Sequence, residues 1–305
     1  MTTNVRPKRI ILSRKGFDSS DASGGQPSPI LENKMFSMPI PEMLPHKTHY
    51  RDIKSPFEGF SDAGKIAAQI TKNKITGEHA AHLDPDLRHD ALVERHVDWR
   101  PVYGQDVGFQ TELRNSQVKE GDLFLFYGLF RKVAQQETRE ELKLAFVRGS
   151  PRKHIMFGWL CIGEIIPVAN AQDADEWVRY HSHVYDNCRP NNALYVAAEK
   201  VFDNLPGAGI FPFVHSRLQL TQEGESCSVW KLPGWFDPQS SGLGRNPYLD
   251  KNGNPRWKRL PDGDWQVLTT SPGQEYVFDA EFYLEGLKWA EGLIREFGDY
   301  RRSVV

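Results

Sequence analysis

The stretch Leu123-Phe124-Leu125-Phe126-Tyr127-Gly128-Leu129-Phe130-Arg131 decides the fold, and it is one of the two densest apolar runs in the chain. Its apolar residues do not alternate with polar ones, so we expect a strand that is buried on both faces of a sheet. The other run, His154 to Pro167, predicts a second long strand, bent at Gly158 and Gly163. Shorter strands are expected at Ile10–Leu12, Leu194–Ala197 and Arg217–Thr221.

Three segments around these strands have helical patterns. Residues 61–75 place apolar side chains on one helical face. Asp84-Pro85 supplies a preferred N-cap and first helical residue, which predicts a helix over 85–96. Residues 279–297 form an amphipathic pattern at the end of the chain. We therefore expect an α+β fold, with a mixed or barrel-like central sheet and flanking helices.

The chain shows no composition break, so one domain over residues 1–305 is expected. Within it we distinguish an N-terminal motif segment (8–115), a β-rich core (118–235), an insertion loop rich in Pro, Gly, Asn and Asp (237–273) and the C-terminal helix (279–297).

Composition excludes several classes of protein. Hydrophobic residues make up 39% and charged residues 26%, which is typical of a globular chain rather than a disordered or fibrous one. With 38 basic and 40 acidic residues, the net charge of −2 argues against a strongly basic surface for nucleic acid. Cys161, Cys188 and Cys227 are widely spaced, and no apolar run approaches the roughly 20 residues of a membrane span. We expect reduced thiols and a cytoplasmic protein.

Sequence motifs of the common enzyme classes are missing. The chain has no phosphate-binding P-loop, no dinucleotide-binding glycine pattern, no nucleophile elbow and no HExxH zinc motif. The cysteine pattern of zinc-dependent deaminases is also absent. An NTPase, a dinucleotide oxidoreductase, an ordinary α/β-hydrolase and a zincin are therefore disfavoured, and no nucleotide cofactor is indicated.

A first polar cluster follows the strand at 10–12. Arg14-Lys15-Gly16-Phe17-Asp18-Ser19-Ser20 places two cations, a carboxylate and two hydroxyls at a strand end, where ligands often bind. The cations and backbone N–H groups suit a phosphate or carboxylate. The alternative is a turn in which Asp18 and Ser19 bond to the local backbone.

A second cluster, His82-Leu83-Asp84-Pro85-Asp86, contains the ligand types of a non-haem iron or another divalent metal site. The three polar side chains share a face only if the backbone is extended, which Pro85 permits. The alternative is structural: Asp84 caps a helix, Asp86 favours the positive end of its dipole, and His82 lies in a loop.

A third cluster is Tyr180-His181-Ser182-His183. In a strand, His181 and His183 point to the same side, as in a two-histidine metal site. Together with His82 and an aspartate they would complete a two-histidine, one-carboxylate set. An ordinary pair of half-buried histidines is the alternative.

Aromatic residues suggest where a base could stack. Trp230 and Trp235 flank Leu232-Pro233-Gly234, which we interpret as a loop that could contact a ligand. Phe124, Phe126, Phe130 and Trp159 are instead expected in the core.

Taken together, these motifs resemble the nucleotide-modification-associated domain family of the third type, from about Lys8 to Phe278. The matching segments are Ile11–Ser19 with Gly24-Gly25 and Pro27–Ile30, His82–Leu87, Gly104-Gln105 with Gln110, Gly121–Phe126, Phe157–Leu160, Ile162–Glu164, His181–His183, Asn192–Ala197, Gly207–Gly209 and Trp230–Pro233. Residues 121–167 are also similar to the barrel of PUA-like domains.

The resemblance implies a role in modifying bases of nucleic acid, a reaction that is only predicted for the family. It transfers functional positions to Lys15, Asp18, His82, Asp84, Asp86, Gln105, Gln110, Arg131, His181 and His183.

We therefore expect an enzyme that modifies a nucleobase or nucleotide. Lys15 and Arg131 would hold an anionic group, with Arg14, Gln105 and Gln110 also contacting the substrate, and Trp230 or Trp235 would stack the base. Lys15, Asp18, His82, Asp84, Asp86, His181 and His183 are the candidate catalytic residues, the last five also as ligands of iron, manganese or zinc. The alternatives are a non-catalytic reader of modified bases and an oxidative metalloenzyme that acts on a peptide or small metabolite.

Overall fold

The structure is a computed structural model of the whole chain. It describes residues 6–18, 23–43, 46–137, 142–169, 174–184, 190–237, 252–269 and 275–299. Ser19, Ser20, Cys188 and residues 238–251 and 270–273 of the expected insertion lie outside the described residues. Cys161 and Cys227 are free thiols.

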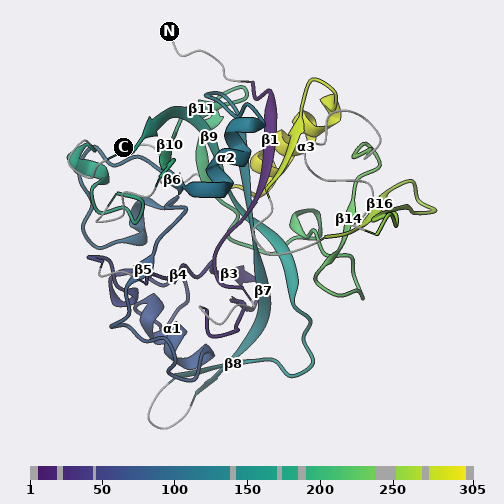
Figure 1. Cartoon of the computed structure of the whole chain (residues 1–305). Coiled ribbons are helices and arrows are strands. Elements are labelled where there is room, and N and C mark those ends of the chain that lie inside the picture. Colours follow the sequence, from purple (N-terminus) through teal and green to yellow (C-terminus); the bar gives the residue numbers. More distant parts are fainter. Residues whose placement is uncertain are drawn as a thin grey trace.

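A large mixed sheet forms the centre of the molecule (Figure 1). Its strands follow the order β17 (Tyr276–Asp279), β1 (Arg9–Arg14), β7 (Leu123–Glu137), β9 (Lys153–Pro167), β10 (Ala193–Ala197) and β6 (Val102–Gln105). β1 is parallel to β7, and the other neighbours on this path are antiparallel. The path has β17 and β6 at its two ends, so no sheet of the described residues closes into a barrel. The mixed sheet is confirmed, whereas the expected barrel is wrong.

β7 and β9 are the long strands that the two apolar runs predict. Residues 123–130 of β7 are all buried, as expected for a strand covered on both faces. The register of β9 shifts at Phe157, next to Gly158, in its pairing with β7 and at Gly163 in its pairing with β10. The expected bends are therefore β-bulges, and at Gly158 a side chain would also clash, because a Cβ there would lie 2.5 Å from Leu87.

Short strands extend this sheet or form small sheets of their own. Four strands belong to the main sheet but lie outside this path: β2 (Ser28–Leu31), β3 (Lys34–Met35), β8 (Leu142–Phe146) and β13 (Ala208–Ile210). Two small sheets consist of two strands each, β4 (Ile40–Pro41) with β5 (Ala81–His82), and β11 (Lys200–Val201) with β12 (Leu205–Pro206). In the expected insertion, β15 (Trp257–Arg259) and β16 (Trp265–Leu268) join β14 (Val229–Leu232) in a three-stranded sheet beside the main body (Figure 1). Residues 257–268 are thus largely strand and not loop.

Helices cover the two ends of β7 (Figure 1). α1 (Ala63–Ile70) lies near β8 and begins at Asp62, whose side chain accepts a hydrogen bond from the Lys65 N–H. Its apolar face belongs to a second core cluster that includes Val133 of β7. α3 (Leu284–Phe297) packs into the main core near β1 and begins later than expected, because β17 ends at Asp279 and a turn follows it. α2 (Val107–Asn115) follows β6.

Two predicted elements are absent. Residues 85–96 contain only the short 3-10 helix η2 (His89–Ala91), because Asp86 instead pairs its backbone with Val102. Residues 217–221 contain part of the 3-10 helix η5 (Ser216–Leu218) and isolated bridges, but no strand. Further 3-10 helices are η1 (Tyr50–Asp52) and η4 (Glu176–Val178). Among the described residues, none of the helices has the length and apolar character needed to span a membrane.

Candidate metal centre

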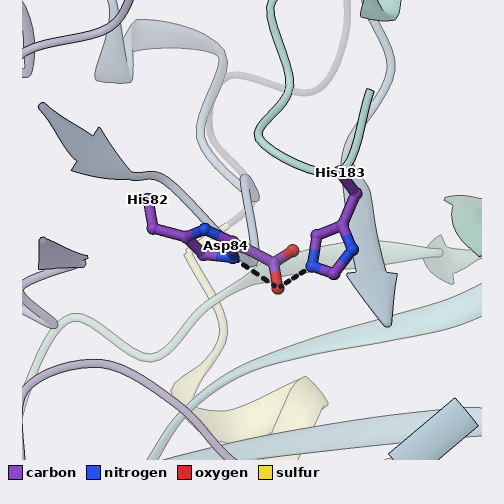
Figure 2. Close-up of side chains that lie close together, drawn as sticks. All are labelled: His82, Asp84 and His183. Carbon is purple, nitrogen blue, oxygen red and sulfur yellow. Dashed lines mark ion pairs between the residues drawn. The ribbon is translucent and has the colours of Figure 1, made fainter. Parts of the chain in front are cut away.

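His82, Asp84 and His183 meet beside the sheet (Figure 2). His82 ends β5, Asp84 follows two residues later, and His183 comes from the turn after η4. The Nε2 atoms of His82 and His183 lie 3.9 Å and 3.8 Å from the same oxygen, Oδ2 of Asp84. One ligand atom from each residue lies within 4.8 Å of the others. This group could therefore hold a metal ion.

The second nitrogen of each of these histidines is held by an oxygen. Nδ1 of His82 lies 2.7 Å from Oε2 of Glu42, and Nδ1 of His183 lies 3.0 Å from Oδ1 of Asn192. An oxygen acceptor at Nδ1 favours the proton on that nitrogen and leaves a lone pair on Nε2. Burial lowers the pKa of His183 to about 3, so this ring is neutral near pH 7. Oxygen acceptors behind the ring are typical of metal-binding histidines.

Asp84 is fixed as a buried carboxylate. Its Oδ1 accepts a hydrogen bond from the Gly104 N–H at 2.8 Å, and its side chain is 3% exposed. Burial alone would raise the pKa of Asp84, but the imidazoles of His181, His183 and His82 outweigh it and hold the pKa below its usual value. The carboxylate is therefore charged at neutral pH and is available to a cation.

His181 adds a fourth polar side chain to this group. Its Nε2 lies 3.4 Å from Oδ1 of Asp84, on the oxygen that also accepts from Gly104. The side chain of His181 is fully buried, and its Nε2 has no hydrogen-bond partner. The expected pairing of His181 and His183 near an aspartate is thus present, but their segment is a turn and not the expected strand.

Gly104 makes room for the ring of His183. A Cβ at this position would lie 2.3 Å from Cδ2 of His183. β6 therefore contributes in two ways, through a backbone donor for Asp84 and through the space left by a missing side chain.

Asp86 lies outside this group. The Arg95 guanidinium donates to both of its carboxylate oxygens, at 2.5 Å and 2.7 Å, and the Tyr180 hydroxyl donates to one of them. Trp99 in turn donates to the Tyr180 hydroxyl at 2.8 Å. Asp86 is fully buried, and its oxygens are bonded within this network. The network also holds Tyr180, the residue before His181, in place. The structure therefore separates Asp86 from the expected set of ligands.

Lys15 and Gln105 belong to a second buried group. Nζ of Lys15 lies 3.8 Å from Oε1 of Glu275, an oxygen that also accepts from Ser13 Oγ at 3.0 Å and from Gln105 Nε2 at 3.2 Å. Gln105 donates as well to the Tyr103 hydroxyl at 2.7 Å. We call Ser13, Lys15, Tyr103, Gln105 and Glu275 the Lys15–Glu275 cluster.

The remaining predicted residues lie elsewhere. Gln110 accepts from the Tyr195 hydroxyl at 2.7 Å, and Nη2 of Arg14 lies 4.0 Å from Oδ2 of Asp18. The Arg131 guanidinium donates to backbone carbonyls of Val147 and Ser150, so it shares no contact with Lys15.

The two tryptophans expected in a loop are packed side chains. Trp230 lies in β14, is 1% exposed and donates through Nε1 to Nδ1 of His154 at 2.9 Å. Trp235 packs against Phe236 and Trp289 beside the main core. The structure thus gives Trp230 no open face for a base.

Sequence reasoning missed six residues of these two groups. They are Glu42, Asn192 and Gly104 at the metal group and Ser13, Tyr103 and Glu275 in the Lys15–Glu275 cluster. Ser13, Gly104 and Asn192 lie in segments that carry the family resemblance, which could have pointed to them. Glu42 and Glu275 are isolated glutamates, and their importance becomes visible only after folding.

The fold and the site together define a mixed α/β protein with a buried His/Asp/His group suited to a metal ion. A family model, nucleotide modification associated domain 3 (Nmad3), matches residues 9–279. The chain therefore belongs to this family. No curated protein and no solved structure matched the chain.

Proposed function

We propose that this protein is a metal-dependent enzyme that modifies a nucleobase or nucleotide. The family supplies the substrate class, because its members are associated with nucleotide modification. His82, Asp84 and His183 supply the reaction centre, as two histidines and one carboxylate that bind a divalent ion. Such a set leaves coordination positions open for substrate and co-substrate.

One observation carries the proposal: both histidines are held through Nδ1, by Glu42 and by Asn192, and both present Nε2 toward Asp84. At 3.9 Å and 3.8 Å, neither Nε2 is hydrogen-bonded to Asp84, yet the two nitrogens and the carboxylate oxygen lie close enough together to coordinate one cation. The arrangement therefore makes more sense as a ligand set than as three groups bonded to one another.

The residues of the chain have separate roles. A bound divalent ion would supply Lewis-acid chemistry or, in the case of iron(II), redox chemistry. Glu42 and Asn192 orient the ligand rings, and the Gly104 N–H orients Asp84. His181 lies against the same carboxylate with an unpartnered Nε2, where it can act as a further ligand or exchange a proton with the substrate.

Metal content tests the first half of the proposal. The protein is purified without oxygen, reconstituted separately with iron(II), manganese(II) and zinc(II), and examined by elemental analysis. We expect one ion per chain in the wild type, and loss of that ion in His82→Ala and in His183→Ala. His96→Ala removes an exposed histidine and serves as the matched control, which should keep the metal. A wild type that binds none of the three ions would contradict the metal centre.

Product analysis tests the second half. Metal-loaded protein is incubated with nucleotides and with DNA, which is then digested to nucleosides and examined by mass spectrometry. A new nucleoside mass that requires His82 and His183 supports the enzyme. Binding of nucleotides that survives both substitutions, with no change in mass, would support a reader of bases instead.

A further inference from the structure

The Lys15–Glu275 cluster contains a buried carboxylate oxygen that the fold leaves without a partner. Oε1 of Glu275 accepts from Ser13 and Gln105, but Oε2 is buried and makes no hydrogen bond. The side chain of Glu275 is only 3% exposed. Burying an unsatisfied acceptor is costly, so native structures rarely keep one without a reason. A donor from outside the chain would satisfy it.

Lys15 supplies the opposite chemistry next to this oxygen. Its Nζ is 3.8 Å from Oε1 of Glu275, beyond hydrogen-bond distance, and 4.6 Å from the centre of the Tyr103 ring. An ammonium group has three donors, and within the described residues none of them makes a hydrogen bond. The side chain keeps 16% of its surface exposed, which is more than Glu275 keeps. Lys15 can therefore donate a hydrogen bond to an acceptor that the described residues do not supply.

We propose that this cluster binds the lactam edge of a nucleobase, in which a ring N–H stands next to a carbonyl. The N–H donates to Oε2 of Glu275, and the carbonyl oxygen accepts from Nζ of Lys15. Thymine, uracil and guanine have this edge, whereas cytosine and adenine have no ring N–H on theirs. The inference rests on the proposed function, because it takes the substrate to be a base.

The cluster and the metal group are connected through strand β6. Three consecutive residues of β6 serve both sites: Gly104 donates to Asp84, while Tyr103 and Gln105 belong to the cluster. Burial raises the pKa of Tyr103, and the carboxylates of Glu275 and Asp84 both raise it further, so the two charges act on one ring from the two sites. A base held by Lys15 and Glu275 would thus be bound against the strand that also positions Asp84.

One ring of the cluster, that of Tyr103, belongs to a stacked aromatic pair. Tyr103 packs against Tyr195 with ring centres 5.7 Å apart, and both rings are buried. Their hydroxyls bond to Gln105 and Gln110, the two glutamines that the family resemblance singles out. Both glutamines are therefore occupied in supporting the cluster, which leaves Lys15 and Glu275 as the groups that select the base.

Binding measurements on the full chain test the assignment without relying on catalysis. Metal-free and metal-loaded protein are titrated by calorimetry with dTMP, dGMP, dCMP and dAMP, and with dTMP methylated at the ring N–H. The oligonucleotides dT10 and dC10 extend the test to single strands. We expect dTMP and dGMP to bind at least about tenfold more tightly than the other two nucleotides, and methylation to remove the advantage of dTMP.

Substitutions test whether Glu275 and Lys15 are the groups that bind the base. Glu275→Gln replaces the acceptor with an amide of the same shape, and Lys15→Met removes the donor; each should weaken dTMP binding about tenfold or more. Glu281→Gln alters an exposed glutamate and should bind like the wild type. If Glu275→Gln fails to fold, the methylated nucleotide still probes the same hydrogen bond in the wild-type protein.

The outcomes separate this inference from the metal proposal. Equal binding of dTMP, methylated dTMP and dCMP overturns the lactam site. A protein that holds its metal but binds no nucleotide or oligonucleotide also overturns it, while leaving the metal centre intact. A protein that selects dTMP without binding metal supports the lactam site and refutes the metal centre.

Discussion

At the scale of single residues, Glu42 decides which nitrogen of His82 faces Asp84. It holds Nδ1 at 2.7 Å through a carboxylate oxygen, which fixes the orientation of the ring. Glu42→Gln keeps an acceptor but removes the charge, so we expect metal affinity to fall about tenfold, and further in Glu42→Ala. Competition with a chelator measures this. Glu58→Gln, at an exposed position, should leave the affinity unchanged, and an unaffected Glu42→Ala would count against the orienting role.

Gly104 offers a second test at the residue scale. A Cβ here would stand 2.3 Å from the His183 ring, so Gly104→Ala must displace that ring or the strand. We expect a loss of metal affinity of more than about tenfold and a loss of stability of about 1–3 kcal/mol. Gly108→Ala is the matched control, since nothing lies within 4 Å of its added Cβ. Chemical denaturation and chelator competition would distinguish the two variants.

At the scale of elements, the Asp86 network replaces a helix that the sequence predicts. Because Arg95, Tyr180 and Asp86 are bonded to one another, the segment after Asp84 is held extended across to the turn that carries His181. We expect Asp86→Asn to destabilise the fold by about 3 kcal/mol, since it leaves the buried Arg95 charge without its partner.

The same variant distinguishes a structural aspartate from a ligand. Folded Asp86→Asn protein should retain its metal, whereas Asp84→Asn should lose it because an amide is a poor ligand for a transition metal. Elemental analysis after reconstitution measures the metal content of both variants. Loss of the ion from well-folded Asp86→Asn would return Asp86 to the ligand set.

The contact between β9 and β14 predicts a pH dependence. Burial, together with the nearby charge of Arg14, lowers the pKa of His154 to about 3, and its Nδ1 accepts from Trp230. The unfolded chain therefore binds a proton that the folded chain does not between roughly pH 6.5 and 3. This contribution to stability is complete above pH 6.5 and is lost as the pH falls, by about 1.4 kcal/mol per pH unit.

His154→Gln keeps an acceptor for Trp230 but cannot take up the proton. Its free energy of unfolding should therefore fall less steeply between pH 6 and 4 than that of the wild type. Urea unfolding at several pH values measures both slopes, and parallel slopes would show that His154 is not buried as a neutral ring.

The elements differ in how far the sequence could predict them. β7 and β9 follow from their own composition, because a strand as apolar as Leu123–Phe130 buries both of its faces in the middle of a sheet. The helix over 85–96 failed because Asp84 and Asp86 have the chemistry of helix-starting residues, and their true partners, Gly104 and Arg95, are set by tertiary contacts. Local patterns do not contain that information.

At the scale of the whole molecule, the metal group joins parts of the chain that are distant in sequence. The sequence could nominate His82, Asp84 and His183 from ligand chemistry, but about a hundred residues separate the first from the last. Only the fold shows that they meet, that Glu42 and Asn192 lie behind them, and that Asp86 does not join them. The proposed lactam site depends even more on the fold, since Lys15 follows β1 and Glu275 precedes β17, and 260 residues separate them.

A metal held between such distant segments should stabilise the whole fold. Ligands that bind only the native state add RT ln(1 + [L]/Kd), which is about 2.7 kcal/mol at a hundred times Kd. For a chain of 305 residues this corresponds to a rise in Tm of about 4 °C. Calorimetry with and without saturating metal should show this rise in the wild type and its loss with a chelator. His183→Ala should show no rise, because its unfolding no longer releases a bound ion; a rise of equal size in that variant would place the stabilising ion elsewhere in the protein.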